Sequence, residues 1–207
     1  MDEEKFKKAI QTLLSEIGED ITREGIKQTP ERVCRMWKNI FYRYNKKLIA
    51  MNEDIRNNGD TETDKNIIPI TIFTNNGYKE MLVREVNGFS TCEHHTLVFP
   101  YKCYVGIIPK DKLLGLNKID KIVKYFGACL QIQERFTTEI ADWINKYIEP
   151  RGVAVMMVGN HFCSVLQGDD GKFTTSAIRG EFLTPTKGVP MQEFLSIVQG
   201  MRQQPHL

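Results

Sequence analysis

The chain has 207 residues, of which 41% are hydrophobic and 26% are charged, a composition typical of a globular protein with a core. Its formal net charge is only +2, and acidic and basic residues alternate along the sequence, which argues against a nucleic-acid-binding surface. No apolar run approaches the roughly 20 residues that span a bilayer, and the N-terminus lacks the apolar segment of a secretory signal. We therefore expect a cytoplasmic protein with no nucleic-acid partner and no membrane partner.

Two helices are predicted at the N-terminal end of the chain. Residues 3–16 place apolar side chains at helical spacing. A second helix is expected to begin near Thr29 and Pro30, with Thr29 as the N-cap and Pro30 in the first helical position, and to continue to Tyr44.

The polar segment that follows is expected to connect two parts of the chain. Residues 45–66 contain many charged and amide side chains and show no hydrophobic period. We therefore divide the chain into an N-terminal helical region with its linker, residues 1–60, and a second domain, residues 61–207.

In the second domain the hydrophobic pattern changes from helical spacing to that of strands. A turn at Asn75-Asn76-Gly77 predicts a hairpin between the first two strands, and a later helical stretch over residues 118–147 is expected to break near Gly127. The predicted strands are residues 67–73, 80–86, 97–109, 152–158 and 173–182, followed by a last helix over 191–201.

This order predicts an α+β fold, in which a four-stranded antiparallel sheet carries a pair of helices on one face. A single sheet of this kind leaves strand edges exposed. Such edges are commonly removed when neighbouring subunits close a barrel, so the pattern also favours a ring-shaped oligomer.

Cysteine and histidine come together in two short clusters, Cys92-Glu93-His94-His95 and His161-Phe162-Cys163. Zinc prefers thiolate and imidazole ligands, and the spacing of Cys92 and His95 suits two ligands that converge from one turn. If the second cluster lies on a strand, His161 and Cys163 face the same side and can both point into one site. The three other cysteines, Cys34, Cys103 and Cys129, are expected to be buried thiols. His206 is expected to be solvated in the C-terminal tail.

Three interpretations of the two clusters remain open at this point. A catalytic zinc site would use three protein ligands and keep a position for water, whereas a structural site would use two cysteines and two histidines. A chain without a metal is the third interpretation. In a catalytic site at least one imidazole stays unligated, and it could act as a general acid or base.

The segments around these clusters resemble the GTP cyclohydrolase I family. Ser90-Thr91-Cys92-Glu93-His94-His95 is similar to its S-x-C-E-H-H signature, and further similar segments follow in family order over roughly residues 15 to 182. These segments are GED at 18–20, REGI at 23–26, TPERV at 29–33, GLNK at 115–118, LQIQER at 130–135, HFC at 161–163 and TSA at 175–177.

The resemblance implies a T-fold, in which sheets from several subunits form a barrel, and a decamer of two stacked pentamers with active sites between subunits. It implies that GTP and water are converted to formate and 7,8-dihydroneopterin triphosphate, with residues 61–207 as the catalytic domain. The site residues it implies are Cys92, His95 and Cys163 as zinc ligands, His94 and His161 for proton transfer, and Gln133 and Glu134 for binding the guanine.

This chain departs from the family pattern at positions that the resemblance assigns to binding of the triphosphate. Asn117 stands where the family has serine, and Gln167 stands where it has arginine, while Lys118 and Lys121 keep a positive charge. Glutamine has neither the charge nor the planar fork with which arginine binds phosphate. Without the resemblance, the two lysines would be interpreted as a solvated helical face. Tyr101 is a further departure, because the family commonly has glycine there.

Two explanations of these departures compete. In the first, the substrate is still GTP, and another cation such as Lys172 or Arg179 reaches the phosphates. In the second, the nucleotide has a different tail or sugar, as in GDP, GMP or dGTP. Two other classes stay open as well: a T-fold guanine-nucleotide-binding protein without turnover, and a nitrile reductase on the same fold, for which the sequence offers no separate nucleophilic cysteine.

Overall fold

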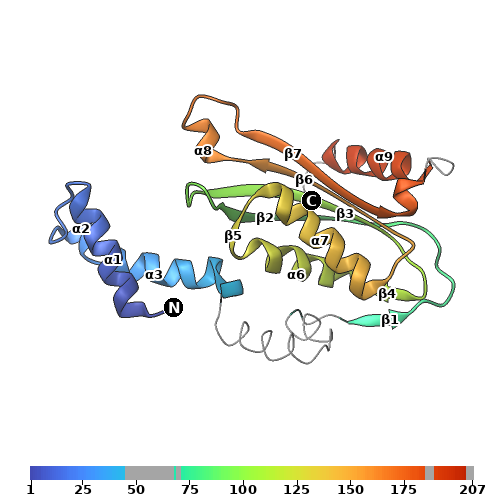
Figure 1. The fold of residues 1–207 in the computed structure, drawn as a ribbon, viewed down its shortest axis with the longest axis horizontal. Helices are drawn as coiled ribbons and strands as arrows, with labels where there is room; N and C mark the ends of the chain where they lie inside the picture. Colours follow the sequence, from blue (N-terminus) through green and yellow to red (C-terminus); the bar gives the residue numbers. More distant parts are fainter. Residues whose placement is uncertain (45–67, 69–70, 185–188, 204–207) are drawn as a thin grey trace.

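A computed structural model of the chain describes residues 1–44, 68, 71–184 and 189–203 (Figure 1). The expected connector over residues 45–66, the expected domain boundary between residues 60 and 61, and His206 lie outside the described residues. Among the helices that are described, none combines the length and the apolar composition needed to cross a membrane.

The N-terminal helices form an arm that extends from the rest of the molecule (Figure 1). Phe6 and Trp37 join its two longer helices through rings whose centroids are 5.2 Å apart. The expected N-cap is wrong by one residue: Gln28, which ends the preceding short helix, holds that position, and Thr29 is already helical. The arm contains α1 (Glu3–Glu16), α2 (Glu24–Lys27), α3 (Thr29–Ile40) and the 3-10 helix η1 (Tyr42–Tyr44).

Arg43 joins this arm to the rest of the molecule. Its guanidinium donates two hydrogen bonds to the carboxylate of Glu139, at 2.9 and 3.1 Å, and a further one to the Cys129 sulfur at 3.3 Å. A bidentate pair of this kind adds orientation as well as attraction. The end of the arm is therefore anchored on the helix that carries Glu139.

The main sheet contains the four antiparallel strands that the sequence predicts, in the order β2-β3-β6-β7. A fifth strand that was not predicted, β5 (Leu130–Gln131), pairs in parallel with the end of β2. β2 is longer than predicted and continues to the first cysteine of the C-E-H-H segment. The four long strands are β2 (Leu82–Cys92), β3 (Val98–Ile108), β6 (Gly152–Asn160) and β7 (Lys172–Gly180).

The hairpin expected at Asn75 is wrong. The short strand β1 (Ile72–Thr74) pairs with β4 (Lys112–Leu114) instead of with β2. The Asn75 side chain donates to the backbone carbonyls of Tyr78 and Lys110, both at 2.7 Å, so it closes the local turn and ties it to the segment before β4. This long-range pairing decides the topology, and turn residues alone do not reveal it.

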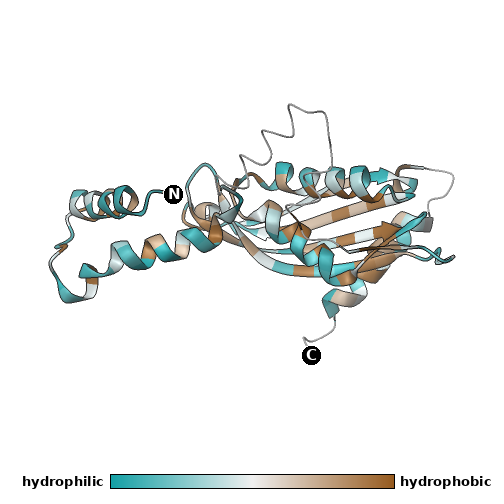
Figure 2. Cartoon of the chain, turned by 90° about the horizontal axis from the view of Figure 1, so that it is seen from below, coloured by the Kyte–Doolittle hydropathy of each residue, from teal (hydrophilic) through white to brown (hydrophobic). Residues whose placement is uncertain are grey.

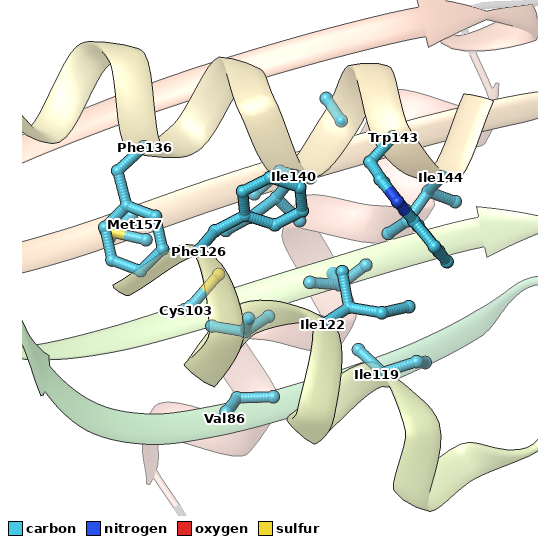
Figure 3. Close-up of a cluster of buried hydrophobic side chains, with 14 of the residues drawn as sticks. Val86, Cys103, Ile119, Ile122, Phe126, Phe136, Ile140, Trp143, Ile144 and Met157 are labelled. Carbon is cyan, nitrogen blue, oxygen red and sulfur yellow. The ribbon is translucent and has the colours of Figure 1, made fainter. Parts of the chain in front are cut away.

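The two faces of the main sheet are covered by different helices. α6 (Leu116–Gly127) and α7 (Gln133–Ile148) pack on one face, where Val86, Cys103, Ile122, Phe136 and Ile140 lie in the larger core (Figure 3). α9 (Val189–Gln203) covers the other face. Figure 2 shows the hydrophobic residues concentrated on the strands, and polar residues on the outer surfaces of the helices. The α+β fold with a helix pair on one face is confirmed, as is the break near Gly127.

Tyr101 has a packing role that accounts for its presence. It lies opposite Gly88 in the register of β2 and β3, and a Cβ atom on Gly88 would lie 2.6 Å from the Tyr101 hydroxyl oxygen. Its ring meets Phe136 edge-on, with centroids 5.2 Å apart. The tyrosine therefore fills the space that the glycine leaves open, and its burial raises the pKa of the phenol.

Candidate active site

The first cluster lies in the tight turn that joins β2 to β3. Cys92 is the last residue of β2; its amide donates to the Leu97 carbonyl, and its carbonyl accepts from the Thr96 amide, both at 2.9 Å. Thr96 has a φ of 54°, in the left-handed region that threonine rarely adopts. The turn brings the side chains of Cys92 and His95 together, with Cys92 Sγ 3.7 Å from His95 Nδ1.

The second cluster is not on a strand, so the expected geometry of His161 and Cys163 is wrong. β6 ends at Asn160, and His161 is the N-cap of a short helix, α8 (Phe162–Val165). The His161 carbonyl accepts from the amides of Ser164 and Val165 at 3.0 and 3.1 Å. Although the chain turns helical after His161, both side chains still line one pocket with the first cluster, and only the Cys163 sulfur lies at ligand distance from Cys92 and His95.

Three of the predicted metal ligands converge in the structure. The ligand atoms of Cys92, His95 and Cys163 all lie within 4.8 Å of one another, and the two sulfur atoms are 3.9 Å apart. In a tetrahedral site with metal–sulfur bonds of about 2.3 Å and metal–nitrogen bonds of about 2.0–2.1 Å, ligand atoms are roughly 3.5–3.8 Å apart. The three side chains therefore fit a metal ion that prefers sulfur and nitrogen ligands.

The two remaining histidines lie beside this cluster without belonging to it. His94 Nδ1 is 4.0 Å from Cys92 Sγ. The His161 ring is stacked on Phe99, with centroids 4.1 Å apart, and its Nε2 lies 2.9 Å from Gln133 Oε1. Burial lowers the pKa of His161, and the charge of Glu134 partly opposes this effect. The arrangement thus contains three residues that could hold a metal, with two further imidazoles beside them.

A pocket of about 300 Å³ opens in front of the cluster. Its wall includes Glu134, which is exposed in the first turn of α7, and Gln167, whose side-chain amide donates to the Cys163 carbonyl at 3.1 Å. The pocket is lined by Cys92, His94, His95, Gln131, Ile132, Gln133, Glu134, His161, Cys163, Ser164, Gln167, Phe173 and Thr175.

The other residues expected to bind phosphate do not line this pocket. Asn117, Lys118 and Lys121 lie on α6, which begins beside β4, at the opposite end of the sheet from α8 and the start of α7 (Figure 1). Arg179 is paired with Asp142 through a hydrogen bond of 2.8 Å and does not line this pocket. Lys172 is exposed at the start of β7, outside the pocket lining.

An ion-pair network behind the pocket was not predicted from the sequence. Arg135 donates to Glu93 at 2.6 Å and to the Gln131 side chain at 2.9 Å, and Gln131 in turn donates to Glu139 at 2.8 Å. The network therefore joins the turn that carries Cys92 to β5 and α7. All four residues lie within or beside the C-E-H-H and LQIQER segments, but the sequence does not show that the two segments contact each other.

Comparisons with known proteins agree with this geometry. The family model described as GTP cyclohydrolase I matches residues 6–199. The chain is similar to GTP cyclohydrolase 1 of Aquifex aeolicus, at 39% identity over 97% of this chain and 99% of the relative. It is also similar to GTP cyclohydrolase 1 of Sulfurihydrogenibium sp., at 36% identity over 98% of both chains. A crystal structure of the archaeosine synthase QueF-Like in the apo form matches at a TM-score of 0.45 and 15% identity, covering 50% of this chain and 97% of that one, a likeness too weak to support an inference.

The fold and the site together define an α+β protein in which two cysteines and one histidine form a cluster that could hold a metal. The chain belongs to the GTP cyclohydrolase I family, a family of metal-dependent hydrolases.

Proposed function

We propose that this chain uses zinc to hydrolyse the imidazole ring of GTP, giving formate and 7,8-dihydroneopterin triphosphate. Residues 61–207 would form the catalytic domain, residues 1–60 the helical region and its linker, and the enzyme would act in the cytoplasm. The observation that carries the proposal is the cluster of Cys92, His95 and Cys163, placed in one pocket with two unligated histidines and a carboxylate.

The donor set supports zinc as the metal. Two thiolates and one imidazole leave one position of a tetrahedral site for water, which distinguishes a catalytic zinc site from a structural one. When bound, zinc would lower the pKa of a water molecule to about 7 and so provide a nucleophile at neutral pH. Burial and the neighbouring Cys92 thiol raise the pKa of Cys163 in the absence of metal, so metal binding would have to displace its proton.

The protein side chains would orient the base and move its protons. The Glu134 carboxylate can accept hydrogen bonds from N1 and the exocyclic N2 of guanine; adenine lacks this pair of donors. A proton delivered to N7 by His161 makes carbon 8 more electrophilic. His94 lies between Cys92 and His95 in the sequence, with its Nδ1 4.0 Å from Cys92 Sγ, and would serve the later proton transfers of ring opening and recyclisation.

The positions of the residues expected to bind the triphosphate support self-association of the chain. Because Lys118 and Lys121 lie on α6 and do not line the pocket of their own chain, we propose that they and Asn117 reach the phosphates of a neighbouring subunit's substrate. The edge strand β7 and exposed apolar side chains near the pocket, such as Leu166 at 77% exposure, support such contacts. A ring-type homo-oligomer, a decamer by family resemblance, is part of the same proposal.

The alternative substrates are favoured by one observation, the glutamine at position 167. Gln167 lines the pocket but offers no charge to a phosphate group. A guanine nucleotide with another tail or sugar, such as GDP, GMP or dGTP, would then be preferred. A protein that binds the nucleotide without turnover is the remaining alternative.

These possibilities are separated by one set of assays on the zinc-loaded protein. GTP, GDP, GMP and dGTP are supplied in turn, and formate and the fluorescence of the oxidised pterin are followed. We expect turnover with the highest kcat/KM for GTP. A higher kcat/KM for another nucleotide would reassign the substrate, and binding of all four without formate would contradict the enzyme.

Replacing Gln167 with arginine should improve the binding of GTP. A charged contact to phosphate contributes about 1.5–3 kcal/mol, so KM for GTP is expected to fall by about 10-fold or more. Gln192→Arg on the exposed surface of α9 adds the same charge away from the pocket and is the control. An unchanged KM in Gln167→Arg would show that the missing arginine does not limit phosphate binding.

A further inference from the structure

Gln133, the first residue of α7, has a buried side chain that faces the His161 ring. Only 3% of the residue is exposed, although it borders the pocket. A buried amide must satisfy both of its ends within the protein. The partners of this amide therefore show what it does.

The nitrogen end of the amide is identified by its surroundings. Gln133 Nε2 lies 3.2 Å from the Met157 carbonyl oxygen and 3.1 Å from that of Phe173, and carbonyl oxygens can only accept hydrogen bonds. If the amide were reversed, its oxygen would face both carbonyls. The nitrogen must therefore point toward β6 and β7, and the oxygen must point toward His161.

Two threonines give the same direction independently. The Thr137 hydroxyl donates its single proton to the backbone carbonyl of Gln133 at 2.7 Å. In the 2.6 Å contact between Thr137 and Thr175, the proton must then come from Thr175. Thr175 is left as an acceptor for Gln133 Nε2, at 3.1 Å, which again leaves Oε1 for His161.

The orientation of the Gln133 amide determines the tautomer of His161. Gln133 Oε1 has no proton to donate, so at 2.9 Å the hydrogen bond requires a proton on His161 Nε2. Within the part of the chain that the structure describes, Nδ1 of His161 has no hydrogen bond. It is the ring nitrogen left for exchange with a ligand.

We propose that Gln133 is a positioning residue, which holds the proton of His161 on Nε2 so that the histidine exchanges protons with the substrate through Nδ1. The inference rests on the proposed function for the identity of the substrate. In the transfer to N7 of guanine, the proton leaves Nδ1 of the imidazolium, and a neutral His161 remains with its other proton on Nε2. This replaces the expectation that the Gln133 side chain binds the guanine, because the protein already occupies both ends of its amide.

The surrounding residues pack closely around the Gln133 amide and the His161 ring. A Cβ atom on Gly159 would lie 2.2 Å from Gln133 Oε1, so the amide reaches His161 only because residue 159 is glycine. Phe99 stacks on the imidazole at an interplanar angle of 16°, and Phe173 meets it edge-on at 83°. Rotation of the ring is therefore opposed on its face and at its edge.

The tautomer can be measured without reference to activity. Zinc-loaded protein is prepared with histidine labelled with nitrogen-15 and carbon-13, and solid-state NMR at about pH 8, above the ordinary histidine pKa, distinguishes Nδ1 from Nε2. The signal of His161 is identified by its loss in His161→Ala. We expect the proton on Nε2 in the wild type; a proton on Nδ1 would overturn the inference.

Two variants should abolish the preference of His161 for the tautomer with its proton on Nε2, and a third should keep it. Gln133→Met keeps the side-chain length without the amide, and Gly159→Ala displaces the amide without changing it. Both should give a mixture of tautomers and lower kcat roughly 10²-fold while KM for GTP changes less than about threefold. Thr137→Val removes a hydroxyl of the same network but keeps both carbonyl acceptors, so Nε2 should stay protonated.

The outcomes separate this inference from the proposed function. If KM rises in Gln133→Met and kcat is kept, Gln133 binds the base and the inference is wrong. If the wild type has Nε2 protonated but releases no formate from any nucleotide, the proposed function fails while the assignment of the tautomer stands. If the proton lies on Nδ1 and turnover is normal, the inference about Gln133 fails while the proposed function stands.

Discussion

Replacing Cys163 with alanine should leave the chain folded, without bound zinc and with formate release reduced by more than about 10³-fold. The thiolate is one of only three ligands that the described residues bring together, and its sulfur lies 3.9 Å from that of Cys92. Loss of one ligand leaves a cysteine and a histidine, too few to hold the metal against dialysis. Metal content after dialysis and formate release measure the two effects separately.

Cys103→Ala is the matched control for this substitution. Cys103 is fully buried in the core between the sheet and its two helices, away from the pocket, and its burial raises the pKa of its thiol. We expect one zinc ion per chain in this variant, with some loss of stability from the small cavity. A Cys163→Ala variant that retains zinc as well as Cys103→Ala does would show that Cys163 is not a ligand.

His161→Ala should have the opposite combination of effects: zinc stays bound, and ring opening falls by roughly 10²–10⁴-fold. The Nε2 of His161 is engaged by Gln133, so this histidine stands apart from the three ligands. Its loss removes the group that we expect to protonate N7, and the nucleophile is left in place. Zinc content and single-turnover formate release from GTP check the two parts of the prediction.

The control for this variant is a neighbour that is exposed and outside the ligand set. Phe162→Ala changes the residue between His161 and Cys163, whose side chain is 46% exposed, and should keep both zinc and most of the activity. If His161→Ala lost its zinc while Phe162→Ala kept it, the ligands would have been assigned wrongly. Wild-type turnover in His161→Ala would instead remove the histidine from the mechanism.

The pairing of Cys92 with His95 in one candidate metal site could be predicted because ligand type and close spacing are local features of the sequence. Cys92 and His95 lie in one turn, so their convergence follows from the chain itself. The position of Cys163 could be predicted only by family resemblance. Alternation along a strand does not explain the position of Cys163, because the chain becomes helical after His161.

Long-range contacts account for most of what the sequence did not show. α6 and α7 follow from hydrophobic period and are confirmed, whereas β1 pairs with a strand about 40 residues away, which no local signal indicates. The role of Gln133 is of the same kind. Its amide meets carbonyls from β6 and β7, and only the folded sheet brings them to the start of α7.

The phosphate end of the site remains the part that a single chain explains least. Glu134, which we propose to bind the guanine, lines the same pocket as Cys92, His95 and Cys163 of the same chain. Lys118 and Lys121 lie on α6 and do not line that pocket, so one chain alone does not bring them to it. Their role depends on the proposed contact between subunits.

The central claim is that the zinc site opens the guanine ring at carbon 8. GTP labelled with carbon-13 at that carbon should be incubated with the zinc-loaded protein, and the products followed by carbon NMR. The account predicts that all of the label that is released appears as formate, in equal amount to 7,8-dihydroneopterin triphosphate. Label that stays in an intact purine, or phosphate released in place of formate, would contradict it.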